Sequence, residues 1–164
     1  MENHALQFED FLLQIPAHAQ GFAEGVHARL TGMGYRCKIE SKPSGVLVSY
    51  GHPKSRRVIL NFLARKKGVF TRIYGDNHAA YADFLRALPQ GMEGDIRRAA
   101  NCKRLRNPED CNSRCPMGYD FFVGDTHYQK CRYSCFQFLA TPESIPVIGE
   151  FVERELAVRE GGAL

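Results

Sequence analysis

Cysteine is the residue type whose spacing in this chain points most clearly to chemistry. Four of the six cysteines form two C-x3-C pairs, Cys111/Cys115 and Cys131/Cys135, and Cys102 is close enough in sequence to be an alternative ligand. A structural zinc ion binds four thiolates in a tetrahedron, with Zn–S distances of about 2.3 Å. A hairpin between the two pairs would bring them together. The spacing therefore predicts a structural Zn2+ site made by these two pairs.

The zinc prediction depends on the local backbone. Two cysteines four residues apart in an extended strand would be separated by about 13 Å. At least one pair must therefore lie in a turn or a helix, where such Cβ atoms are about 5–6 Å apart. His127, between the pairs, could replace one thiolate. The alternatives are an iron–sulfur cluster, disulfides, a thiol redox switch and plain buried thiols. Cys37 alternates with Tyr35 and Ile39, and we expect it to pack in the core.

Composition sets the class of protein. The chain has 164 residues, of which 44% are hydrophobic and 24% charged, as in an ordinary soluble domain. The N-terminal segment has no basic region ahead of an apolar run, and no apolar run approaches the roughly 20 residues of a membrane span. We therefore expect a cytoplasmic protein with no membrane partner. In that compartment thiols stay reduced, and clustered cysteines bind metals more often than they form disulfides.

Hydrophobic periodicity predicts an α+β domain with two layers. Residues from about 4 to 31 are expected to form a helix in two pieces, interrupted at Pro16. Four runs with strand character follow, and the short turns between them predict a four-stranded antiparallel meander. The third run is apolar on both faces, which is typical of an inner strand. The predicted strands are residues 35–41, 46–50, 56–64 and 68–74.

The rest of the chain is expected to supply helices and a cysteine-rich hairpin. A helix should run from Asp76 to Pro89, capped by Asp76 or Asn77, and a weaker helix should follow from Gly91. A hairpin should turn at "VGDT", between the cysteine pairs, and an amphipathic helix should close the chain. The expected parts of this single domain are a helix–meander–helix core (1–100), a zinc-knuckle-like cysteine-rich segment (101–140) and a C-terminal helix that packs on the core (141–164).

No catalytic residue is predicted, because the sequence lacks the G-x-S-x-G, P-loop and H-E-x-x-H patterns. One face of the meander is instead a candidate ligand surface. Ligand pockets combine apolar walls with a few placed polar groups. An amide, a cation and two aromatic rings have the parity to share this face: Asn61, Phe70, Arg72 and Tyr74.

Basic residues make nucleic acid an alternative partner. Eight of them and no acid lie between residues 41 and 75, but successive turns of a meander alternate between the two ends of the sheet, which splits this group in space. Exposed aromatic residues such as Tyr128 and Tyr133 beside a zinc knuckle would suit RNA or single strands. A second basic cluster precedes the cysteine pairs and consists of Arg97, Arg98, Lys103, Arg104 and Arg106.

The segment "CKRL…C…CPMGYDFFVG…YQKCRYSCFQF" resembles part of an uncharacterised bacterial family of Cys-rich α+β proteins. The resemblance implies a bacterial origin and carries no activity. The cysteine spacing and the lack of catalytic motifs lead to a non-catalytic, zinc-stabilised binding or sensor domain. The alternatives are a nucleic-acid-binding protein that uses the basic turns and the zinc knuckle, and a thiol redox switch.

Overall fold

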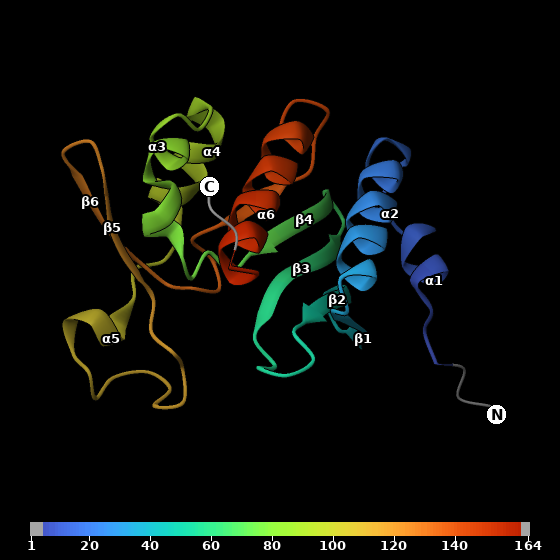
Figure 1. Cartoon of the computed structure of the whole chain (residues 1–164), viewed down its shortest axis with the longest axis horizontal. Helices are drawn as coiled ribbons and strands as arrows, with labels where there is room; N and C mark the ends of the chain where they lie inside the picture. Colours follow the sequence, from blue (N-terminus) through green and yellow to red (C-terminus); the bar gives the residue numbers. More distant parts are fainter. Residues whose placement is uncertain (1–4, 162–164) are drawn as a thin grey trace.

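The fold is α+β, with a five-stranded antiparallel sheet and helices on it, as shown by a computed structural model that describes residues 5–161 (Figure 1). The strand order is β1-β2-β3-β4-β7, and β5 and β6 form a separate hairpin. The strands are β1 (Arg36–Lys42), β2 (Gly45–Gly51), β3 (Val58–Arg65), β4 (Gly68–Ile73), β5 (Tyr119–Val123), β6 (Thr126–Lys130) and β7 (Gln137–Leu139). The helices are α1 (Phe8–Leu12), α2 (Ala17–Gly32), the 3-10 helix η1 (His78–Tyr81), α3 (Ala82–Arg86), α4 (Gln90–Arg98), α5 (Lys103–Arg106) and α6 (Ile145–Arg159).

The predicted meander is confirmed for β1 to β4, and the sheet extends beyond it. Each of these strands pairs antiparallel with the next one along the chain. Gly45 opens β2 at φ +136°, and a Cβ there would collide with the carbonyl of Ala64, so the first turn needs glycine. The prediction of four strands is wrong in number, because β7 adds a fifth strand at the β4 edge.

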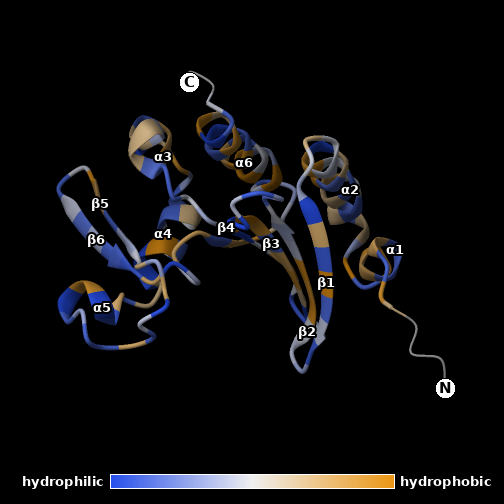
Figure 2. Ribbon diagram, turned by 60° about the horizontal axis from the view of Figure 1, so that its bottom comes forward, coloured by the Kyte–Doolittle hydropathy of each residue, from blue (hydrophilic) through white to orange (hydrophobic). Residues whose placement is uncertain are grey.

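The core lies on the face of the sheet that the helices cover. Figure 2 shows α2 and α6 over the same face, and both helices contact strands of the meander. Val48, Phe62 and Thr71 are neighbours across β2, β3 and β4, and all three are fully buried on this face. Pro16 separates α1 from α2, as predicted, because its fixed φ suits a helix start.

The cysteine-rich segment (residues 101–140) joins the sheet through its C-terminal part. The predicted hairpin is confirmed as β5 and β6, and its turn places Gly124 at φ +59°. The weaker helix predicted from Gly91 is interrupted. It ends at Arg98, and the next residues run extended beside β6, where Asn101 bridges Lys130. In Figure 1 this hairpin and α5 form the lobe at the left, away from α1.

The helices within residues 5–161 differ from membrane-spanning helices. None of the helices in this part of the chain combines the length and the apolar character needed to cross a bilayer.

Candidate functional site

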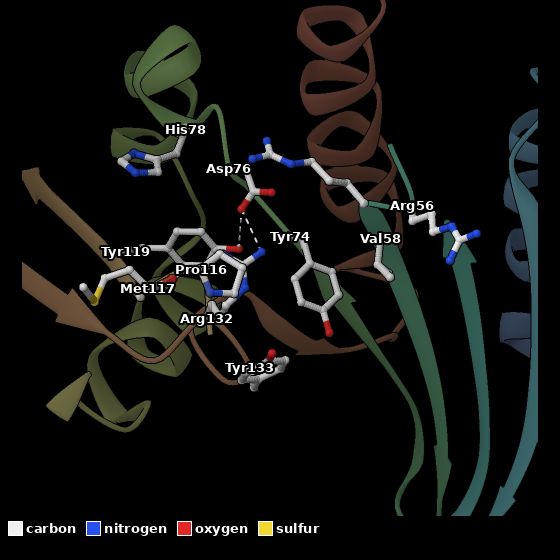
Figure 3. Close-up of a pocket in the computed structure, with 12 residues that line it drawn as sticks. Arg56, Val58, Tyr74, Asp76, His78, Pro116, Met117, Tyr119, Arg132 and Tyr133 are labelled. Carbon is white, nitrogen blue, oxygen red and sulfur yellow. Dashed lines mark hydrogen bonds and ion pairs between the residues drawn. The ribbon is translucent and has the colours of Figure 1, made fainter. Parts of the chain in front are cut away.

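A cleft of about 510 Å³ lies where the end of the meander meets the cysteine-rich segment (Figure 3). One wall comes from the β2–β3 loop and from the residues that follow β4. The opposite wall comes from the start of β5 and from the turn between the last two cysteines. Charged and aromatic side chains line these walls: Arg56, Arg57, Tyr74, Asp76, His78, Tyr119, Arg132 and Tyr133.

Asp76 is at the centre of a largely buried ion-pair network in this cleft. Its carboxylate oxygens accept hydrogen bonds from Arg132 at 2.9 Å and from Arg159 at 3.3 Å, and the hydroxyl of Tyr119 lies 3.4 Å away. The side chains of both arginines are 10% exposed and that of Asp76 is 18% exposed. Charges removed from water to this extent are stable only when they are paired and hydrogen-bonded. The network therefore joins β4, α6 and the cysteine-rich segment at one carboxylate.

Glu155 extends the network beyond the lining of the cleft. This fully buried residue of α6 accepts hydrogen bonds from the Asn77 backbone N–H (2.9 Å), the Asn77 side chain (2.8 Å), the Tyr81 hydroxyl (2.6 Å) and Arg159 Nε (2.7 Å). The prediction that Asp76 or Asn77 caps the following helix is wrong. Neither side chain makes a capping bond to η1, because both are engaged by the ion-pair network.

Arg132 is held by stacking as well as by charge. Its guanidinium lies 5.3 Å from the ring centroid of Tyr74 and 5.4 Å from that of Tyr119, and it also donates to the Met117 carbonyl at 3.2 Å. Burial opposes its charge, but the paired carboxylate of Asp76 keeps the pKa of Arg132 above its ordinary value. Burial raises the pKa of the Tyr119 phenol, so this hydroxyl is neutral at physiological pH.

Four side chains of the cleft remain available to a ligand. Arg56 and Arg57 are exposed and make no ion pair with any residue between 5 and 161, and Arg56 has φ +61°. Tyr133 is 46% exposed, and over the same part of the chain its hydroxyl makes no hydrogen bond. His78 packs beside the ring of Tyr119, and burial lowers its pKa, which favours a neutral imidazole. Two guanidinium groups without an acidic partner can bind an anion.

The structure places the predicted ligand surface on one sheet face but only partly in the cleft. Asn61 pairs with Arg72 across β3 and β4, and Phe70 pairs with Leu63 two residues along, so these side chains share the face opposite the core. Asn61 accepts a hydrogen bond from the Tyr74 hydroxyl at 2.7 Å. Arg72 donates to Gln137 of β7 at 2.9 Å. Tyr74 alone of the four predicted residues lines the cleft.

All six cysteines are free thiols, and five of them lie in the cysteine-rich segment. The Cys135 N–H donates to the Cys131 carbonyl at 2.9 Å, so the second pair lies in a turn and not in an extended strand. Cys135 is fully buried, and burial raises the pKa of its thiol. Cys111 is exposed, and Cys102 packs against Gly118. Over residues 5–161 no three Cys, His, Asp or Glu side chains lie close enough together to hold a metal ion.

The remaining sequence predictions concern packing and charge. Cys37 is half-buried against the core, as expected. Tyr128 is buried, so the prediction that it is exposed is wrong, because β6 turns that ring inward onto Phe121. Arg97 and Arg98 pair with acids of their own helix, Glu93 and Asp95, which leaves less of the second basic cluster free. Nucleic-acid binding stays a prediction.

One feature of the sequence, the acid at position 155, indicates the network. Ile148, Phe151 and Val152 make an apolar stripe on α6, and Glu155 continues this stripe with a carboxylate. An acid at a buried helix position requires partners, and Arg159 one turn later is such a partner.

Comparison of the chain with protein-family models, curated proteins and solved structures found no match, so the bacterial origin suggested above also stays a prediction.

Proposed function

We propose that the protein is a binding domain whose cleft takes an anionic small molecule. The observation that carries this proposal is the imbalance of charge in the cleft. Among residues 5–161, Asp76 is the one carboxylate in its lining, and Arg132 and Arg159 already neutralise it. Arg56 and Arg57 then contribute two positive charges that have no acidic partner within residues 5–161. Guanidinium groups bind carboxylate and phosphate through parallel hydrogen bonds.

Binding is favoured over acid–base catalysis by Asp76 or Tyr119, because both groups are already engaged in the network of the cleft. Asp76 accepts from two arginines, and its neighbour Tyr119 is a phenol whose pKa is raised. A general base needs a free lone pair directed at the substrate. A network with its hydrogen bonds already made is suited to holding the walls of the cleft at fixed positions.

The experiment is titration of the full chain with inorganic pyrophosphate at low ionic strength, with heat of binding and melting temperature as readouts. We expect saturable binding that raises the melting temperature, since a ligand bound only by the folded state stabilises it. The double variant Arg56→Asn/Arg57→Gln should bind at least about 10-fold more weakly, from the loss of charge-assisted hydrogen bonds. Asn tolerates the positive φ of position 56.

The matched control is Lys66→Gln/Lys67→Gln, which removes the same charge from the exposed β3–β4 turn at the opposite end of the sheet. Equal weakening by both double variants would show a diffuse effect of net charge and would reject the cleft as the site. Unchanged binding in the Arg56/Arg57 variant would reject it as well.

We propose, second, that the cysteine-rich segment binds a structural zinc ion. The turn between Cys131 and Cys135 supports this, because it meets the condition that one C-x3-C pair must not be extended. The thiols as described do not form a cluster of three or four, so zinc binding requires Cys111 and Cys115, on a largely exposed loop, to close on that turn.

Elemental analysis of protein purified without added metal or chelator tests this second proposal. We expect about one zinc ion per chain, lost in both Cys111→Ser and Cys131→Ser, since a structural site needs all four ligands. Cys37→Ser is the control and should keep the metal, because Cys37 packs beside the core in another part of the fold. Metal-free protein would overturn the proposal, and fast alkylation of one thiol in that sample would favour the redox alternative.

A further inference from the structure

The cleft is larger than a simple anion would need. Pockets of about 300–1,000 Å³ hold organic molecules of moderate size, and this cleft has a volume of about 510 Å³. The two free guanidiniums lie on the β2–β3 loop at one wall. An inorganic phosphate bound to Arg56 and Arg57 would leave the part of the cleft near the cysteine-rich segment unfilled.

The unfilled part of the cleft is lined by aromatic rings. Tyr74 and Tyr119 both pack against the guanidinium of Arg132, which fixes their orientation. Tyr133 is different, because it is 46% exposed although it stands edge-on to Tyr74 with 6.1 Å between ring centroids. Figure 3 shows the rings of Tyr74 and Tyr133 on the same side of the Asp76 network. An exposed tyrosine held in place by its neighbours is a surface on which a planar group can stack.

We infer that the ligand is a planar aromatic ring system that carries a phosphate or carboxylate, of about the size of a mononucleotide. The ring lies against Tyr133, and the anionic group lies between Arg56 and Arg57. The inference rests on the proposed anion site, which would bind only the charged group, and it adds the ring as the second part of the ligand. Stacking on an aromatic side chain tolerates different ring systems, so the chemical class is set by planarity and charge more than by one pattern of hydrogen bonds.

The test compares two probes that share a phosphate and differ in the ring. Adenosine 5′-monophosphate and ribose 5-phosphate carry the same anionic group, and only the first has a base. We expect the wild-type protein to bind the nucleotide about 10-fold or more tightly than the sugar phosphate, from the effect of base stacking. Tyr133→Leu should abolish this preference with little change in the affinity for ribose 5-phosphate. Tyr133→Phe, which keeps the ring, should retain the preference.

Phe122→Leu is the control for the loss of an aromatic side chain, because Phe122 is 61% exposed on β5 and does not line the cleft. It should retain the preference for the nucleotide. Equal affinity of the wild type for both probes would overturn this inference and leave the anion site standing. Binding of neither probe would overturn the anion site too. Affinity for a single-stranded oligonucleotide that rises steeply with its length would assign the cleft to nucleic acid and overturn the mononucleotide.

Discussion

Asp76 and Glu155 show how single residues hold this cleft together. Both are acids with little or no exposure, and each is bound by at least one arginine. Arg159 contacts both acids and also donates to the carbonyls of Val58 and Tyr74, so one side chain ties α6 to β3 and to the residue that follows β4. A buried charge left without its partner is costly, which makes each member of this network depend on the others.

Replacing Glu155 by alanine tests that dependence. The change removes the carboxylate that accepts from Arg159 Nε, from the Asn77 backbone N–H and from the Tyr81 hydroxyl. We expect the free energy of unfolding to fall by roughly 3–5 kcal/mol, as is usual when one partner of a buried ion pair is removed. Urea denaturation with an unchanged m-value measures it.

Glu150→Ala provides the comparison within the same helix. Glu150 pairs with Arg154 one turn away, but both side chains are substantially exposed. Exposed pairs of this kind contribute about 0.3–0.5 kcal/mol, so this variant should be close to wild type. Similar losses in the two variants would mean that the buried contacts of Glu155 contribute no more than an exposed ion pair, which would contradict its role in the network.

At the residue scale the sequence predicted packing better than it predicted the site. Cys37 and Tyr74 lie where alternation along a strand puts them. The importance of Asp76, Arg132 and Arg159 was missed, because each is an ordinary charged residue in its local context. Their meeting depends on three distant segments of the chain, and periodicity carries no information about such contacts.

Secondary-structure elements were predictable where their interactions are local. The β1–β4 meander has short connections, and turn residues together with strand periodicity specify such hairpins. β7 was missed because it has only three residues and no turn signals beside it. Its pairing with β4 is also distant in sequence, since the contact between Arg72 and Gln137 spans 65 positions. α2 was located by its apolar stripe although it contains Gly21 and Gly25.

Gly25 lies inside a helix and Gly45 in a tight turn, and replacing each by alanine should change the stability in opposite directions. In the middle of α2, a Cβ on Gly25 would meet no atom within 4 Å. Gly25→Ala should therefore raise the free energy of unfolding by about 0.5–1 kcal/mol, because alanine loses less conformational entropy in a helix. Gly45→Ala should lower it by more than about 1 kcal/mol, because the turn needs φ +136° and leaves no room beside Ala64. Thermal and urea unfolding of both variants would reveal either sign.

At the scale of the whole molecule, the cleft belongs to the junction between two parts of the chain. The meander supplies the β2–β3 loop and the residues after β4, and the cysteine-rich segment supplies Tyr119, Arg132 and Tyr133. The sequence predicted both parts and the order in which they occur. It could not predict that they form a common cavity, because this depends on where Phe136 and β7 attach to the sheet.

The attachment of β7 has a consequence for the time course of folding. Hairpins of neighbouring strands close quickly, whereas a pairing across more than sixty residues has a large loop-closure cost and forms late. We expect refolding in which the amides of β2 and β3 become protected from exchange before those of β7, as pulse-labelling would record. Simultaneous protection would contradict this order. A chain leaving the ribosome would thus have a complete meander before its cleft exists, and the proposed affinity for an anion would appear only with the last step of folding.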